Sequence, residues 1–414
     1  MTATTRALHL IDPVRAGWPA CDALRTLLDC PGGEVEHEVV LVGAAPDMLM
    51  ADRLGLRWSR RVPAPPRAAG AFANRTESLW SGHAAPDVLC TWSESTLLLG
   101  HGAGRRMKRL GVLIDPPAGI AKAPIRRRLL RGALGRTDRL VFSTRFARSA
   151  WLALGLPPGS TSVAPIPIDL GRLEPGARTR LREEWCVEDK TGVILAVAEP
   201  GSAVQAQRCV YHAGIATLAG ARNALVLPPD ADQLDRALRF TERHSGWWRL
   251  IVDDRPVWEL LEACDAALWF GPPALPDGHS LRGPVPGGTG MAWAAASGCP
   301  VVAESHESIL ESLADGPRVH LCRSGNRIEV CSAILEALDP VNRGQGSVRS
   351  SDPVLAARHD PDAFARRITG EILAACGRGT APSVEPGAVI GEAKVRVSGG
   401  RASIRATAPA GAPR

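Results

Sequence analysis

The sequence contains no long hydrophobic run. Residues 1–11 lack an apolar core of signal-peptide length, and no later stretch approaches the ~20 apolar residues of a membrane span. Internal repeats of solenoid length are also missing. The chain of 414 residues is 45% hydrophobic and 22% charged, which suits a folded protein of two domains. We therefore expect a cytoplasmic, two-domain protein.

The ten cysteines include no CxxC pair. They are scattered from Cys21 to Cys376, which is neither the spacing of a zinc site nor that of a disulfide framework. Cys264 and Cys299 are flanked by apolar or small residues, and we expect them to be small core hydrophobes in a reducing compartment.

The chain has little net positive charge outside its C-terminal tail. Residues 377–414 hold six basic and two acidic side chains, so most of the net charge of +6 lies there. A protein that binds the nucleic-acid backbone needs basic residues on a folded face, or on an arm that also carries aromatic residues. This tail has no aromatic residue. The sequence therefore disfavours nucleic-acid binding, and the Gly/Ala/Pro/Arg tail is predicted to be disordered.

Short apolar runs alternate with longer amphipathic stretches over most of the length. This alternation predicts an α/β fold with doubly wound parallel sheets. The predicted strands are 7–11, 38–42, 88–91, 110–114, 139–143, 193–197, 224–227, 249–252, 266–270, 301–303 and 319–321. The predicted helices are 20–28, 125–134, 206–218, 232–244, 257–264, 289–297, 308–313, 328–338 and 361–375.

A proline-rich stretch near residues 160–172 divides this pattern into two halves. We predict an N-terminal Rossmann-like domain over 1–168 and a C-terminal one over 169–342. A last helical region over 352–376 follows a Gly/Ser-rich loop, and the basic tail begins at 377.

Three glycines surround Thr289 and open a run of small helix-forming residues. Gly287, Gly288 and Gly290 let backbone N–H groups approach a ligand, and a helix start carries a positive dipole end. The helix leads into the strand candidate 301–303. This order predicts an anion site, most naturally for phosphate. An ordinary helix-to-strand junction of a parallel-sheet domain would have the same pattern.

Two tandem Rossmann-like halves with a glycine-rich turn in the second resemble the GT-B glycosyltransferases, and the second half is similar to glycosyltransferase family 4. The likeness covers roughly residues 7–376. The segments that carry it, in the family's order, are 8–12 with Gly17, 142–144, 152–157, 163–169, 257–270, 287–303, 311–316 and 364–373. Residues 8–12 and Gly17 resemble the family's opening strand and glycine loop, and 364–373 resembles its last helix, which crosses back to the first domain.

The resemblance implies a retaining transfer of sugar from a nucleotide-sugar to an acceptor hydroxyl. The nucleotide-sugar is a co-substrate, and neither a cofactor nor a protein-held metal is implied. Gly287, Gly288, Thr289 and Gly290 would face the donor phosphates, and Gly17 would line the same site.

Departures from the family pattern fall on its donor-binding residues. Two glutamates of the donor loop, the second of which holds the ribose hydroxyls, align with Val285 and Trp293. The cations that neutralise the diphosphate align with Glu199 and Gln205, although Arg208 lies nearby and could substitute. An indole cannot accept hydrogen bonds from ribose, so Trp293 should stack on a base or fill the ribose space. Donor binding should then be weak or altered.

Two residues of the first half are candidate catalytic groups. His101 lies in a glycine-rich stretch and could bind the acceptor or orient the donor sugar; its alternative is a solvated loop histidine. Glu94 follows a predicted strand, at the edge where parallel-sheet proteins bind ligands. Its alternative is a plain surface carboxylate.

Basic side chains form a band over residues 105–131, including Arg126, Arg127 and Arg128. The apolar side chains Ile125, Leu129, Leu130 and Leu134 fall on one face of the predicted helix. Such a helix could rest on an anionic membrane, or it could be a core helix with a solvated basic face.

Three functions remain open. The first is a glycosyltransferase with degenerate signature carboxylates, and the second is a catalytically silent GT-B protein that binds or scaffolds. The third is a sugar-nucleotide epimerase, for which no carboxylate or histidine set can be identified. A diverged active site could be rebuilt from Arg208, His212 or Arg282.

Overall fold

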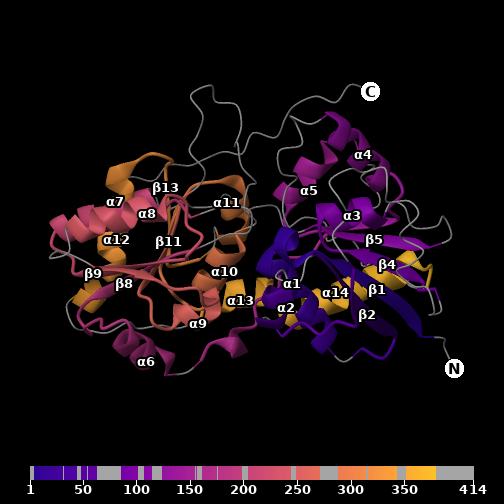
Figure 1. Cartoon of the computed structure of the whole chain (residues 1–414), viewed down its shortest axis with the longest axis horizontal. Helices are drawn as coiled ribbons and strands as arrows, with labels where there is room; N and C mark the ends of the chain where they lie inside the picture. Colours follow the sequence, from indigo (N-terminus) through magenta and orange to yellow (C-terminus); the bar gives the residue numbers. More distant parts are fainter. Residues whose placement is uncertain are drawn as a thin grey trace.

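The computed structural model contains two parallel β-sheets that lie side by side (Figure 1). The residues it describes are 4–30, 32–43, 48–53, 55–62, 85–100, 107–113, 124–153, 155, 161–174, 176–197, 204–243, 249–270, 288–313, 316–342 and 351–378. The predicted α/β class with two doubly wound sheets is confirmed.

The first sheet has seven strands in the order β3-β2-β1-β4-β5-β6-β7. Their bounds are β1 Thr5–Ile11, β2 Val35–Val42, β3 Arg60–Val62, β4 Val88–Thr91, β5 Lys108–Leu113, β6 Arg139–Phe142 and β7 Thr161–Val163. All pairings are parallel, and β4 is buried at all four positions, as expected for a strand covered on both faces.

The second sheet has six parallel strands in the order β10-β9-β8-β11-β12-β13. They are β8 Gly192–Ala196, β9 Asn223–Leu227, β10 Arg249–Val252, β11 Ala266–Trp269, β12 Val301–Glu304 and β13 Val319–Cys322. Every strand predicted from the sequence is present in one of the two sheets. β3 and β7 are additional, because three residues carry too little periodicity to be recognised.

Helices cover both faces of each sheet. In the first half they are α1 Pro13–Asp29, α2 Met48–Arg53, α3 Glu94–Gly100, α4 Pro124–Leu134 and α5 Arg145–Leu152. The later helices are α6 Ala177–Glu184, α7 Ala206–Leu218, α8 Leu234–Arg243, α9 Val257–Leu261, α10 Thr289–Ala296, α11 Glu307–Leu313, α12 Arg327–Asn342, α13 Pro353–Arg358 and α14 Pro361–Ala375, with the 3-10 turn η6 Leu170–Arg172. In the described part of the chain, no helix is long and apolar enough to cross a membrane.

The last helix returns to the first sheet. α14 packs against α1 and β5 (Figure 1), and its residues Phe364, Ile368 and Ile372 are buried there. Glu371 of α14, 1% exposed, pairs with Arg139 at the start of β6. The C-terminal helix therefore belongs to the core of the first sheet, in agreement with the cross-over helix that the resemblance implies.

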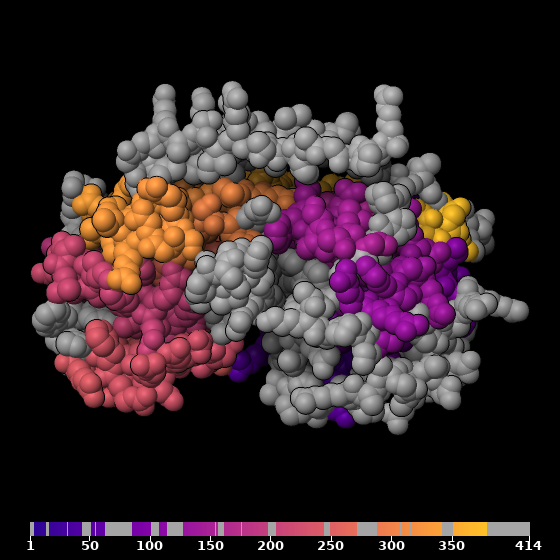
Figure 2. Space-filling view, turned by 90° about the horizontal axis from the view of Figure 1, so that it is seen from above, coloured from indigo at the N-terminus to yellow at the C-terminus, as the bar shows by residue number. Residues whose placement is uncertain are grey.

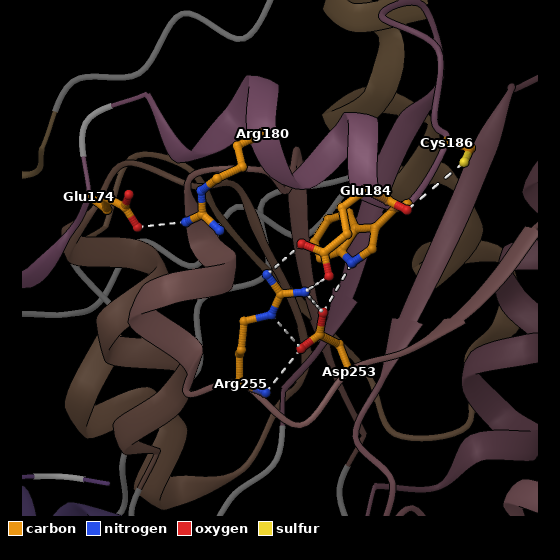
Figure 3. Close-up of polar contacts among 7 residues, drawn as sticks. Glu174, Arg180, Glu184, Cys186, Asp253 and Arg255 are labelled. Carbon is orange, nitrogen blue, oxygen red and sulfur yellow. Dashed lines mark hydrogen bonds and ion pairs between the residues drawn. The ribbon is translucent and has the colours of Figure 1, made fainter.

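Helix α6 is held to the end of β10 by a polar cluster. Arg255 donates from Nη1 to Glu184 at 3.0 Å and from Nε to Asp253 at 3.0 Å, and Trp185 Nε1 donates to Asp253 at 3.0 Å (Figure 3). Because α6 has few apolar positions, it is secured by these charges as well as by the buried Leu181. Its charged sequence does not show the helical period.

The two connections between the sheets meet at His359. Its Nδ1 donates to the carbonyl of Ile166 at 2.8 Å, and its own carbonyl accepts the N–H of Ile168 at 2.8 Å. His359 lies between α13 and α14, whereas Ile166 and Ile168 follow β7. One buried histidine thus ties both chain crossings together.

Burial lowers the pKa of His359 to about 4. A histidine whose pKa is lower in the folded than in the unfolded chain stabilises the fold above pH ~6.5 and loses that stabilisation as pH falls toward 4. His9 and His212, also buried with lowered pKa, act in the same direction.

We expect the free energy of unfolding to fall by up to about 3 kcal/mol between pH 6.5 and 4 through His359 alone. Urea denaturation at several pH values measures this free energy. His359→Asn can keep the hydrogen bond to the carbonyl of Ile166, and its free energy of unfolding should depend less on pH. Equal slopes for the two proteins would contradict the assignment.

Candidate functional site

The carboxyl ends of the strands in the two sheets face each other. Trp18, in the helix after β1, contacts Trp258 in the helix after β10, with ring centroids 5.5 Å apart. Phe146, in the helix after β6, contacts His306, which follows β12, at 5.3 Å. Doubly wound folds bind ligands at this edge of the sheet. Figure 2 shows the two halves meeting side by side, and their shared edge is the candidate site.

Three tryptophans pack together where the halves meet. Trp258 contacts both Trp18 and Trp293, the latter with centroids 5.5 Å apart, and the Arg172 guanidinium lies 3.8 Å from the Trp258 ring centroid. Trp293 is 0% exposed and its Nε1 has no hydrogen-bond partner. The indole of this α10 residue therefore fills apolar volume between α10 and α9.

Gly288 caps the start of helix α10, and its φ of 73° lies in the left-handed region that favours glycine. A Cβ at Gly288 would lie 3.1 Å from Ile309 Cδ1 and 3.4 Å from Ser312 Oγ. Thr289 and Gly290 form the buried first turn, at the carboxyl edge of the sheet. The predicted glycine-started helix is confirmed, and its role in binding phosphate stays a prediction.

A partly buried ion pair holds Arg208 at the end of β12. Glu304, 2% exposed, accepts hydrogen bonds from both Nη atoms of Arg208 and, at 3.0 Å, from the backbone N–H of Gly325. The Arg208 guanidinium lies 4.5 Å from the ring centroid of Phe270, on which His212 stacks at 4.9 Å. Burial, with the positive charge of Arg208, lowers the pKa of His212 to about 4. Glu304 thus offsets the charge that Arg208 would offer to a diphosphate.

Polar side chains also gather at the ends of β1 and β4. Ser95 donates to Asp12 at 3.1 Å, and the hydroxyls of Ser93 and Ser95 are 2.8 Å apart. Glu94 is the first residue of α3 and is half-buried, so its predicted position at the carboxyl edge is confirmed. His101 lies outside the described residues.

Gly17 lies between two helical pieces, and its role in lining the donor site stays a prediction. It interrupts α1 with φ 72° and ψ 170°, so the chain forms two helical pieces across a kink. The short first piece forms because Ala16 N–H already donates to the carbonyl of Asp12 at 2.8 Å, and Pro19 suits the first turn of the second. Gly17 still lies next to Trp18 at the meeting edge.

Gly287, Val285, Glu199 and Arg282 also lie outside the described residues. Gln205 immediately precedes α7, at the end of the sheet where its aligned cation would lie. Arg208 is one turn further along the same helix.

No protein-family model matches the sequence, and no curated protein matches it. Solved structures do match. Alr3699/HepE from Anabaena in complex with UDP and glucose gives a TM-score of 0.66 at 15% identity, over 88% of this chain and 98% of that one. A glycosyltransferase from Rickettsia africae gives 0.62 at 12% identity, over 90% and 98% of the two chains. UDP-GlcNAc 2-epimerase from Neisseria meningitidis bound to UDP-GlcNAc gives 0.58 at 10% identity, over 90% and 100%.

This chain has the GT-B fold. About nine-tenths of the chain is covered in each comparison. At these identities it shows the architecture and does not distinguish glycosyltransferase family 4 from other GT-B proteins.

The facing strand ends also carry residues that the sequence analysis does not single out, namely Asp12, Ser95, Glu304 and His306. Asp12 and Glu304 each stand at the end of a buried strand, the same signal that identifies Glu94. The pairing of Glu304 with Arg208 spans 96 residues and has no signal in the sequence.

Helix α4 of the first GT-B domain turns its apolar face into the core. Leu130, Ala133 and Leu134 are buried, whereas Arg127 and Arg128 are exposed. This arrangement favours the core helix with a solvated basic face. Contact with an anionic membrane therefore stays a prediction, and it would be electrostatic rather than insertion of the helix.

We expect weak co-sedimentation with anionic vesicles at low salt that fades as ionic strength rises, because exposed charges are screened. Arg127→Glu with Arg128→Glu should abolish it, and Arg236→Glu with Arg239→Glu, on the exposed face of α8, should not. Pelleting with neutral vesicles, or none with anionic ones at low salt, would contradict this prediction.

Proposed function

We propose that this chain is a glycosyltransferase-like protein that binds a nucleotide-sugar in the GT-B cleft and transfers the sugar to an acceptor hydroxyl. The observation that carries the proposal is helix α10, whose start is capped by Gly288 on the carboxyl edge of the second sheet. A helix start attracts phosphate through its dipole and backbone N–H groups. Alr3699/HepE, solved in complex with UDP-glucose, supports a uridine nucleotide as the first ligand to test.

The first domain would supply the residues that contact the acceptor or the donor sugar. Glu94, beside Ser93, Ser95 and Asp12, is the polar group that we propose to contact the acceptor or the donor sugar. His101 is the second candidate for this role. Retention of configuration is the outcome expected from the resemblance.

The donor site of this protein is remodelled. Gln205 is uncharged, and Arg208 is paired with Glu304, so the start of α7 offers little net positive charge to a leaving diphosphate. Stabilisation of that developing charge supplies much of the catalysis in such reactions. We therefore expect transfer from common uridine and guanosine donors to be slow.

A catalytically silent binding protein is the second candidate, and Trp293 favours it. The indole is fully buried against Trp258, at the position that the resemblance assigns to a ribose-binding carboxylate. Such a protein would bind nucleotide without turnover. The epimerase alternative is supported only by neighbours such as the UDP-GlcNAc 2-epimerase.

One assay separates these functions. The protein is incubated with UDP-glucose or UDP-GlcNAc and an acceptor mixture, and nuclear magnetic resonance follows free UDP, glycoside and 2-epimer. Acceptor-dependent release of UDP supports transfer, and a new 2-epimer supports epimerisation. Saturable binding without either product supports the silent protein, and absence of binding contradicts the proposal.

Gly288→Ala should weaken nucleotide binding by at least about tenfold, because the new Cβ would lie 3.1 Å from Ile309 Cδ1 and shift the turn that would face the phosphates. The matched control is Gly176→Ala, because Gly176 also caps a helix, with φ 88° and open space around it. Titration calorimetry measures both. If Gly288→Ala binds like the unmodified protein, the phosphate role of this turn is wrong.

A further inference from the structure

A carboxylate of the second domain occupies the start of a helix in the first. Glu311 of α11 accepts the backbone N–H of Arg145 through Oε1 at 2.6 Å and that of Phe146 through Oε2 at 2.9 Å. These are the first two N–H groups of α5, which have no partner within a helix. Figure 1 shows α5 and α11 facing each other between the two sheets.

The contact is specific in its geometry. Thr144 caps α5 and accepts the third N–H, from Ala147, at 3.0 Å, so the helix start is complete only with Glu311 in place. A negative carboxylate at the positive end of a helix dipole is favourable, and both of its oxygens are used.

Neighbouring contacts fix Glu311 on its own side. Arg358 donates to the carbonyls of Glu311 and Ser312, each at 3.2 Å, so α11 is tied to α13. The ring of Phe146 meets His306 edge to face at 5.3 Å. The Glu311 contact therefore joins two segments that are each held in place by further contacts.

Other bridges between the halves lie in other elements of the described chain. Trp18 contacts Trp258, Arg172 pairs with Asp22, and His359 ties the two chain crossings together. These contacts involve α1, α9, η6 and the connections, whereas Glu311 joins α11 to α5. Loss of the Glu311 contact would leave the halves connected, with the ring contact of Phe146 and His306 still joining them at α5.

We propose that Glu311 is an interdomain latch that holds the cleft closed at the α5 side. The latch opens when its carboxylate leaves the two N–H groups of α5, and the halves then pivot about the tryptophan contact and the His359 connection. The inference concerns domain orientation and does not depend on which ligand the cleft binds.

Two substitutions break the latch from opposite sides. Glu311→Gln keeps the shape and removes the charge and one acceptor oxygen. Arg145→Pro removes the N–H that meets Oε1, and proline is well tolerated at the first position of a helix. The extended backbone of Thr144, with φ −139° and ψ 158°, also suits the residue before a proline.

Two matched controls distinguish loss of the latch from loss of the Arg145 guanidinium or of a negative charge elsewhere. Arg145→Ala keeps the backbone N–H while removing the guanidinium. Glu242→Gln, on the exposed part of α8, removes the same charge away from the cleft.

Hydrogen exchange of the full-length protein tests the proposal, with small-angle scattering as the measure of opening. Glu311→Gln and Arg145→Pro should each speed exchange several-fold at the start of α5 and in α11 and enlarge the radius of gyration, while both controls match the unmodified protein. The double variant should have neither faster exchange nor a larger radius of gyration than either single variant. Unchanged exchange in α11 for Arg145→Pro, or an unchanged radius in both latch variants, would overturn the latch.

Discussion

Asp265→Ala should lower the free energy of unfolding by about 3–5 kcal/mol, the usual cost of breaking a buried ion pair from one side. Asp265 is 1% exposed, accepts the Val193 N–H at 2.8 Å and pairs with Arg182 at 3.1 Å. Arg182 is itself 2% exposed, so removal of Asp265 leaves a buried positive charge. Arg178 loses a partner at 2.8 Å as well.

Glu184→Ala is the matched control on the same helix, α6. Its carboxylate pairs with Arg255 but is 52% exposed, so we expect a cost below about 1 kcal/mol. Urea denaturation of both variants provides the comparison. Similar losses for the two would show that the charge at Asp265 is not buried as described.

Trp293→Glu should destabilise the protein by more than about 4 kcal/mol, because it removes a buried indole and introduces a carboxylate into an apolar core. Trp293 is 0% exposed and packs on Trp258. Introducing the glutamate that the resemblance expects, with or without Val285→Glu, should therefore destabilise the fold rather than improve binding of ribose. Thermal denaturation with and without UDP measures both effects.

Trp293→Phe is the appropriate control. It keeps an aromatic ring and removes an Nε1 that has no partner, so it should cost far less. A Trp293→Glu protein that melts like the parent and binds UDP more tightly would instead mean that the indole occupies an open ribose site.

The sequence predicts the architecture well because parallel strands are buried on both faces. Continuous runs such as those of β8 and β11 stand out against amphipathic helices, and the bounds of α7 and α14 agree at both ends with those predicted. The sequence pattern reveals neither helix α6 nor the kink at Gly17. Helix α6 is held largely by charged side chains, and the kink depends on the backbone conformation of one residue.

The candidate site is less predictable because its contacts join distant residues. Glu94 and Gly288 are identified by their places beside a strand and a helix. The pairing of Glu304 with Arg208 and the docking of Glu311 on α5 depend on how separate elements meet. The burial of Trp293 by Trp258 likewise follows from the meeting of α9 and α10, which no local pattern reveals.

Titration calorimetry of the unmodified protein with UDP and UDP-glucose tests the central claim most directly, which is that this GT-B cleft binds a nucleotide diphosphate at the start of α10. The account predicts saturable binding of at least one of these ligands, and the Gly288→Ala protein should lose it while the Gly176→Ala protein keeps it. Absence of binding by both nucleotides, or equal binding by the two glycine variants, would contradict the account.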